Sequence, residues 1–307
     1  MGIDIGDGFG TGTGDGDGGG IPGIISKRCD LNDRMKRITE NGGTPQCEEA
    51  VVKSLRWLKK QQNGNGSWGE GQFRASMTGI SLLAYLAHCE TPLSEEFGEN
   101  VLKGISFLVD LGMKNPVLSE QPALKEICYD HAVATYALCE AYTFCKQMDI
   151  PSISNLEKVV IKAVDKIVDN QNTDGGWAYN YNTKAGAHTD LSVTGWNVQA
   201  LKAAEHGGIR PSKGEIRTAL RKAAAYCRKC GKPDGLFTYM QEGREDAAAR
   251  PSLVGVGVLS LQMCGNGSDS AARKGLDWIK NNVKTLQWGQ GSGTENVKSN
   301  LYMHYYC

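Results

Sequence analysis

The residues best suited to chemistry recur at one position of a repeated pattern. They are Arg74, Asp130, Asp190, Arg250 and Asn300, separated by 56, 60, 60 and 50 residues. Because the segments around them align, we expect these side chains at the same end of successive helices, around one mouth of a central cavity. Two arginines and two aspartates there suit a polar ligand head, since arginine presents a planar fork of donors. The plainer interpretation is that the aspartates cap helices and pair with the arginines.

Two histidines adjoin this column of polar residues. His131 follows Asp130, and His188 lies shortly before Asp190. Carboxylates and imidazoles are the usual acids and bases of catalysis, so Asp190, Asp130 and His131 are the candidate catalytic residues. A buried histidine with satisfied hydrogen bonds is the plainer interpretation of His131, and we expect His188 to be exposed in a polar turn.

The ten cysteines do not form the disulfide framework of a small secreted domain, because the chain has 307 residues. We expect five of them to be buried, reduced thiols that pack as small apolar side chains: Cys89, Cys128, Cys139, Cys145 and Cys264. Cys227 and Cys230 form a lone CxxC pair, for which zinc or redox use is the alternative. No second pair follows at a suitable spacing, so we predict neither a metal nor a cofactor.

Aromatic residues on the apolar helices form a further candidate set. Tyr136, Trp196 and Tyr302 are expected to line the cavity, together with Tyr85, Tyr305 and Tyr306. Such rings could hold a cationic or apolar ligand, whereas at helical spacing they are also compatible with ordinary core packing.

A helical hairpin repeated about five times would position these residues. Each copy combines an amphipathic helix, a glycine-rich turn and a more apolar helix, which predicts amphipathic helices outside and apolar helices inside. The predicted pairs are 48–61 and 73–88, 96–111 and 127–145, 155–171 and 190–205, 212–229 and 252–264, and 270–283 and 299–307. An aromatic residue follows the turn at Trp68, Trp177, Phe237 and Trp288, and we expect it to anchor the turn. The copy at 96–145 lacks it.

The segments before the repeats differ in composition. Residues 1–21 are rich in glycine and aspartate and are expected to be a flexible linker, which indicates that a membrane anchor or another domain once preceded it. Residues 22–47 form an extension with one short helix at 31–39, and Thr44-Pro45 starts the next helix. The repeat domain is 48–307. Its last helix is short, so we expect a truncated chain or an open ring with a frayed end.

Charge and hydropathy limit the partners. The formal net charge is zero, with 34 basic and 34 acidic residues, so we predict no nucleic-acid partner. No apolar run approaches the roughly 18 residues of a spanning helix, so no transmembrane segment is expected, and we recognise no signal peptide.

The repeat resembles that of the squalene-cyclase and prenyltransferase superfamily. The resemblance rests on Gln61-Gln-Asn-Gly-Asn-Gly-Ser-Trp68 and Gln171-Asn-Thr-Asp-Gly-Gly-Trp177, and it covers residues 48–307. The stretch 41–68 is similar to uncharacterised bacterial squalene-cyclase-like proteins. The resemblance implies an all-α fold, an α/α toroid whose central cavity holds an isoprenoid or another apolar ligand, or a peptide.

The catalytic motifs of that superfamily are incomplete. Its cyclases carry Asp-x-Asp-Asp-Thr, whereas the matching segment is Asp190-Leu-Ser-Val-Thr194, with Ser192 at the position of the protonating aspartate. Its prenyltransferases need a cysteine where Ser192 stands and a histidine on the next inner helix. The sequence therefore predicts a non-catalytic binding or interaction toroid with an apolar ligand or a protein partner. The alternative is a divergent terpenoid or isoprenoid cyclase or transferase acting on a polyprene.

Overall fold

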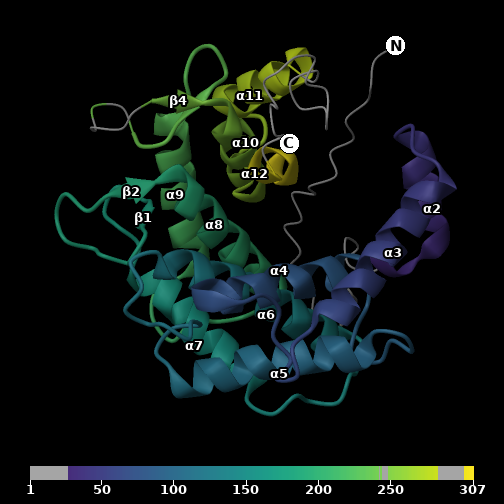
Figure 1. Cartoon of the computed structure of the whole chain (residues 1–307). Coiled ribbons are helices and arrows are strands. Elements are labelled where there is room, and N and C mark those ends of the chain that lie inside the picture. The colour runs from purple at the N-terminus through teal and green to yellow at the C-terminus, as the bar shows by residue number, and fades with distance from the viewer. Residues whose placement is uncertain (1–26, 242, 244–247, 283–300) are drawn as a thin grey trace. The chain divides into compact units, whose positions relative to one another are not determined.

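A computed structural model describes residues 27–241, 243, 248–282 and 301–307 (Figure 1). The predicted linker at 1–21, the turn at Trp288 and the rim residue Asn300 lie outside these residues. The described chain is mostly helical, which confirms the all-α class. It divides into two compact units. The first unit contains residues 27–169 and 203–216, and the second contains the described residues of 170–202 and 217–307.

The helices follow the predicted hairpins. Their bounds are α2 (Leu31–Glu40), α3 (Pro45–Gln61), α4 (Arg74–Ala87), α5 (Gly98–Lys114), α6 (Ile127–Gln147), α7 (Leu156–Asp169), α8 (Leu191–His206), α9 (Ile216–Cys230), α10 (Val254–Met263), α11 (Ser270–Asn281) and α12 (Leu301–Tyr306). The predicted helices within the described residues are confirmed, with ends shifted by a few residues. Helix α3 begins at Pro45 with Thr44 at the N-cap, as expected, although the Thr44 side chain makes no capping hydrogen bond. The fraying of the last helix stays a prediction.

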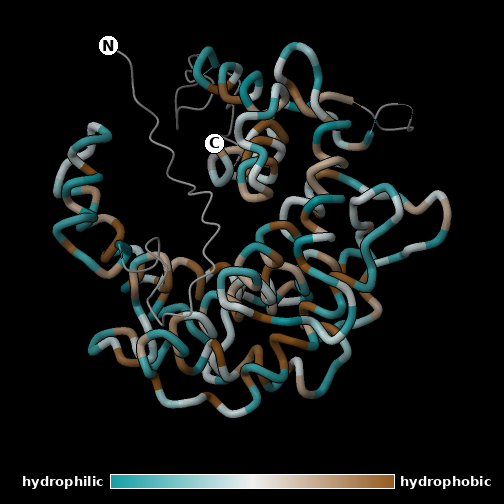
Figure 2. The backbone as a smooth tube through the Cα atoms, turned by 180° about the vertical axis from the view of Figure 1, so that it is seen from behind, coloured by the Kyte–Doolittle hydropathy of each residue, from teal (hydrophilic) through white to brown (hydrophobic). Residues whose placement is uncertain are grey.

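The alternation of amphipathic and apolar helices is visible in the first unit. Helix α7 buries one stripe, whereas most side chains of α6 are buried. Helices α4 and α6 lie side by side (Figure 1), and a Cβ at Gly79 of α4 would stand 3.0 Å from the Val133 carbonyl oxygen of α6. The hydrophobic stretches lie within the packed helices, and the loops are mostly hydrophilic (Figure 2). The apolar helices therefore form the core of this unit.

Three turns between paired helices have the same hydrogen bonds. Asn63 N–H donates to Ser67 O over 2.9 Å and Asn172 N–H to Gly176 O over 2.9 Å, and Lys232 N–H donates to Leu236 O over 2.8 Å. In each turn an Asn or Asp side chain, at Asn65, Asp174 or Asp234, accepts from the backbone two residues later. The repeat predicted from the sequence is therefore confirmed in the local geometry of its turns.

Each of these turns packs a glycine with positive φ against the next amphipathic helix. The glycines are Gly66, Gly175 and Gly235, with φ of 89°, 96° and 88°. A Cβ on them would stand 2.4, 2.3 and 2.4 Å from the carbonyl oxygens of Lys103, Lys222 and Lys274, respectively. Only glycine permits so close an approach in this conformation.

The aromatic residue after each turn is an anchor, as predicted. Trp68 and Trp177 are buried. Their backbone N–H groups donate to Thr78 Oγ1 (2.9 Å) and Thr194 Oγ1 (3.3 Å), respectively. Phe237 is buried against Gly257.

The apolar helices share one C-terminal cap. After α4, α6, α8 and α10 the chain turns through a residue with positive φ, at Cys89, Asp149, Gly208 and Gly265. In each case the next N–H donates to the carbonyl five residues earlier, for example Glu90 to Tyr85 over 2.9 Å. This is the Schellman arrangement, in which glycine is the usual residue. Cysteine and aspartate occupy it here in the first two copies.

Two small antiparallel pairs were not predicted. Strand β1 (Trp177–Ala178) pairs with β2 (Thr189–Asp190), and β3 (Phe237–Thr238) pairs with β4 (Ala249–Arg250). Each pair places the residue just before an apolar helix opposite the aromatic residue that follows the turn: Asp190 lies opposite Trp177, and Arg250 lies opposite Phe237. No helix within the described ranges combines the length and apolar character that crossing a membrane requires.

Candidate functional site

Asp190 is the predicted site residue with the most unusual environment. It ends β2 opposite Trp177 and immediately precedes α8. Its carboxyl oxygen Oδ1 accepts from the Val193 N–H over 3.0 Å, so it caps the helix. The side chain is fully buried, and Oδ2 makes no hydrogen bond of ordinary geometry within the described part of the chain, although the Tyr239 hydroxyl lies close to the carboxyl.

Burial controls the charge of this carboxyl. It raises the pKa of Asp190 to about 7, against the opposing effects of the Val193 and Ser192 N–H groups, the Tyr239 hydroxyl and the Arg250 charge. A carboxylic acid with this pKa is largely protonated at slightly acidic pH, unlike an exposed aspartate.

Tyrosines surround Asp190 in the second unit. The hydroxyl groups of Tyr179 and Tyr239 are hydrogen-bonded to each other. The Arg250 guanidinium lies 4.5 Å from the centroid of the Tyr239 ring, a cation–π contact. Tyr226 is fully buried, and burial raises its pKa far above the usual range. Burial also raises the pKa of Tyr302, close to the Ser192 hydroxyl and Asp190.

This arrangement could donate or accept a proton at Asp190 Oδ2. It could equally hold a polar group by hydrogen bonding. Because Asp190 is 0% exposed, either use requires the surrounding residues to open. We call Asp190, Tyr179, Tyr226, Tyr239 and Tyr302 the Asp190 cluster.

Asp130 has a structural environment in the first unit. It is buried, and Oδ1 accepts from the Ser76 N–H over 3.0 Å while Oδ2 accepts from the Ser119 hydroxyl over 2.8 Å. Ser76 lies in the first turn of α4, so Asp130 caps the neighbouring helix rather than its own. Burial raises its pKa. Both carboxyl oxygens are therefore used to connect α6 with α4 and the loop before α6.

His131 holds the loop before α6. Its Nδ1 accepts from the Leu118 N–H over 2.9 Å, and its Nε2 lies 3.0 Å from the Ala163 carbonyl oxygen. These contacts require a neutral imidazole with the proton on Nε2. Burial lowers the pKa of His131 to about 4. The contacts favour the buried, satisfied interpretation over a role as acid or base.

Arg74 of the predicted column does not form the expected ion pair. Arg74 pairs with Glu120, at 3.3 Å, and not with Asp130, whose two oxygens are already occupied. Arg250 stacks on Tyr239, although its charge lowers the pKa of Asp190. The predicted pairing of Arg74 with Asp130 is therefore wrong. Arg74, Asp130 and His131 lie in the first unit and Asp190 and Arg250 in the second, so their grouping around one mouth stays a prediction.

The predicted aromatic lining separates into different environments. Trp196 is buried and stacks on Tyr305, with ring centroids 5.1 Å apart. The ring centroids of Tyr302 and Tyr306 lie 5.0 Å apart. Tyr136 is half-buried in α6. Tyr85 is core, because it is fully buried and donates to the Leu55 carbonyl oxygen over 2.9 Å. His188 is exposed, as predicted, and stacks on Tyr179.

One expectation about the cysteines is wrong. Cys89 is not a reduced core thiol, because it forms a disulfide with Cys29. The other core cysteines Cys128, Cys139 and Cys145 are buried thiols outside any disulfide, as predicted, and Cys264 is half-buried. Cys227 and Cys230 are also buried and unpaired. Within the described residues no group of three or more metal-ligating side chains comes together.

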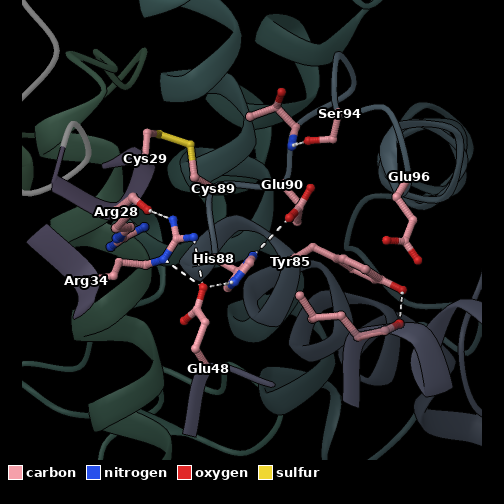
Figure 3. A network of polar contacts seen from close by, with 12 residues as sticks. Arg28, Cys29, Arg34, Glu48, Tyr85, His88, Cys89, Glu90, Ser94 and Glu96 are labelled. Carbon is pink, nitrogen blue, oxygen red and sulfur yellow. Dashed lines mark hydrogen bonds and ion pairs between the residues drawn. A yellow bond between two sulfur atoms is a disulfide. The ribbon is translucent and has the colours of Figure 1, made fainter. Parts of the chain in front are cut away.

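A polar network surrounds the disulfide at the last turn of α4 (Figure 3). Arg34 pairs with Glu48 at 2.9 Å, and Glu48 also lies 3.0 Å from His88 Nε2. His88 Nδ1 lies 2.9 Å from Glu90. The hydrogen bond to Glu90 raises the pKa of His88, and the bond to Glu48 adds to this effect. The network connects α2, α3 and the end of α4.

Sequence reasoning missed three members of the Asp190 cluster, although two of them carried a repeated signal. Tyr179 and Tyr239 each follow the turn aromatic by two residues, in Trp177-Ala-Tyr179 and Phe237-Thr-Tyr239. The first copy has Glu70 there, which hid the pattern. Tyr226 lies on the amphipathic helix α9 and carried no comparable signal.

Comparison with known proteins does not assign the chain to a family. No protein-family model matches the chain, and no curated protein matches it significantly.

Proposed function

We propose that the chain is a squalene-cyclase-like and prenyltransferase-like α/α toroid that binds a partner without catalysing a reaction. One observation carries the non-catalytic part: polar side chains at the predicted rim of the first unit are used to hold the fold. Asp130 has both carboxyl oxygens hydrogen-bonded, and His131 has both ring nitrogens at hydrogen-bonding distance. A catalytic acid or base needs an atom that can reach the substrate, and these have none left.

The apolar face of α4 supports a binding role. This helix buries most of its side chains, yet Met77 and Ile80 are 45% and 42% exposed on one face. In the proposed toroid this face of an inner helix points into the cavity. It would accept an isoprenoid or a similar apolar ligand, because burying its side chains against apolar groups is favourable.

A binding measurement tests this proposal. Titration with a fluorescent polyprenyl probe should show saturable binding without turnover. Met77→Gln together with Ile80→Gln should weaken binding at least tenfold, on the basis of roughly 1.5–3 kcal/mol for each large buried apolar side chain. Val51→Gln with Leu93→Gln is the matched control, because these residues are also exposed and apolar but lie on α3 and the loop before α5. Equal affinity of both double variants would contradict the proposal.

The Asp190 cluster favours a second candidate function. A carboxyl with a pKa of about 7 is a stronger base than an exposed aspartate, so it could remove a proton from a cationic intermediate derived from a polyprene among aromatic rings. This divergent cyclase or transferase would convert a polyprene, and conversion would disappear in Asp190→Asn. Absence of any product from a panel of polyprenes, with folded protein, would exclude it.

A further inference from the structure

The segment before the first hairpin is attached in an unusual way. Helix α2 buries none of its side chains, and Leu31 at its start is 54% exposed. Apolar burial therefore contributes little to holding this segment in place. Its attachment depends instead on the Cys29–Cys89 disulfide and on ion pairs.

The ion pairs of this segment are mostly buried. Arg34 and Glu48 retain 20% and 17% of their side-chain exposure, and Arg28 pairs with Glu140 of α6. Pairs this far removed from solvent are screened less than exposed ones, yet they engage two side chains of the segment, Arg28 and Arg34. A ten-residue helix without a buried face is also marginal on its own. The disulfide is the covalent cross-link among these attachments, so it is the one that reduction removes.

The backbone conformation at Cys89 indicates that a cysteine stands here because its sulfur is needed. Cys89 has φ of 65° at the αL cap after α4, a position that Gly208 and Gly265 occupy after α8 and α10. A non-glycine residue in this conformation costs free energy, so cysteine is a poor choice unless its side chain has a use. The sulfur of Cys89 meets Cys29 across a Cα–Cα distance of 5.0 Å.

The disulfide is accessible to a reagent in solution. Cys29 is exposed and Cys89 is half-buried. By contrast, Cys139, Cys145 and Cys227 are buried, and burial raises the pKa of Cys145 to about 11. A soluble dithiol can reach the Cys29–Cys89 bond without unfolding the core.

We propose that the Cys29–Cys89 disulfide is a redox-operated clasp, whose reduction releases residues 27–40 from the first hairpin while α4, α5 and α6 stay folded. A thiolate of an external dithiol attacks one sulfur of the disulfide and forms a mixed disulfide, and the other cysteine leaves as a thiolate and takes up a proton. The second thiol of the dithiol then displaces the first cysteine. The dithiol becomes a disulfide, and the protein gains two electrons and two protons.

Hydrogen exchange followed by mass spectrometry tests the clasp. In the full chain, amides of residues 31–40 should exchange at least tenfold faster after reduction with dithiothreitol and alkylation than in the oxidised protein. Exchange in α4, α5 and α6 should not change. Cys29→Ser should behave as the reduced protein with or without reductant. Cys89→Gly should do the same, and it keeps the αL cap without strain.

Cys47→Ser is the matched control, because Cys47 is exposed but unpaired. It should retain the response of the parent protein to reductant. Three results would overturn the proposal: equal protection of residues 31–40 in both redox states, faster exchange in α4, α5 and α6 to the same extent, or free thiols at Cys29 and Cys89 in protein purified without reductant.

Discussion

At the scale of single residues, Asp190 should make stability depend on pH. Its folded pKa of about 7 lies above the value near 3.9 of an exposed aspartate. Between these values the folded protein keeps a proton that the unfolded chain has lost, so stability falls as pH rises from about 4 to 7. The difference between these two pKa values corresponds to roughly 4 kcal/mol.

Urea unfolding of the parent protein and Asp190→Asn at pH 4.5 and pH 8 measures this effect. The variant removes the titration, so the parent protein should lose stability relative to it by about 3–4 kcal/mol over this interval. Asp277→Asn, at an exposed position of α11 in the same unit, should show no such change. A constant difference between parent and Asp190→Asn would contradict the buried, protonated carboxyl.

His131 should act in the opposite direction, because burial lowers its pKa to about 4. The unfolded chain binds a proton near pH 6.5 that the folded protein does not, so this stability is present above pH 6.5 and is lost as pH falls towards 4. His131→Ala also leaves the Leu118 N–H without its acceptor and creates a cavity in the core. We expect it to destabilise the protein by about 3 kcal/mol or more in thermal unfolding at pH 7.5.

The exposed His188→Ala is the comparison for this prediction, and it should cost less than about 1 kcal/mol. If both variants melted at the same temperature, His131 would not be the residue that holds the loop before α6.

At the scale of elements, the turn glycines should be intolerant of a side chain. Gly175 has φ of 96°, and a Cβ there would stand 2.3 Å from the Lys222 carbonyl oxygen. Gly186 in the same unit also has positive φ, at 80°, but a Cβ would meet nothing within 4 Å. Gly175→Ala should therefore cost about 3 kcal/mol or more, and Gly186→Ala about 1 kcal/mol. Urea unfolding of both variants gives the comparison, and equal costs would refute the close packing of the turn.

These turns also show what the sequence could predict. Glycine, asparagine and tryptophan at a fixed spacing reveal a turn through local rules, so the hairpins and anchors at Trp68 and Trp177 were predictable. Long-range pairing has no such signal. The disulfide between Cys29 and Cys89 spans 60 residues, and Asp130 caps α4 across 54 residues. Sequence spacing alone cannot indicate which distant groups meet.

The candidate site was predicted only in part for the same reason. Asp190 was found because it starts an apolar helix, and its N-cap role follows from local rules. Its pKa depends on how deeply β2 is buried and on Tyr239 and Arg250, which come from the next repeat. Burial is a property of the assembled unit, and the column of aligned polar residues contained no information about it.

At the scale of the whole molecule, the repeated hairpins should unfold in groups of adjacent copies rather than all at once. In a repeat array each copy is stabilised by its own helices and by contact with the adjacent copy. Gly66 lies in the first turn and approaches the Lys103 carbonyl oxygen of α5, so Gly66→Ala disturbs one such contact. The loss of stability caused by Gly66→Ala should be confined to the helices nearest this turn.

Hydrogen exchange of Gly66→Ala should therefore be at least tenfold faster in α3, α4 and α5 and unchanged in α9 and α11. Gly64→Ala is the matched control, because it lies in the same turn and its Cβ would meet nothing within 4 Å. Uniformly faster exchange throughout the chain would mean a single cooperative unit, contrary to a repeat array. Confinement to the first hairpins would leave the second unit, with its Asp190 cluster, as a separate element of stability.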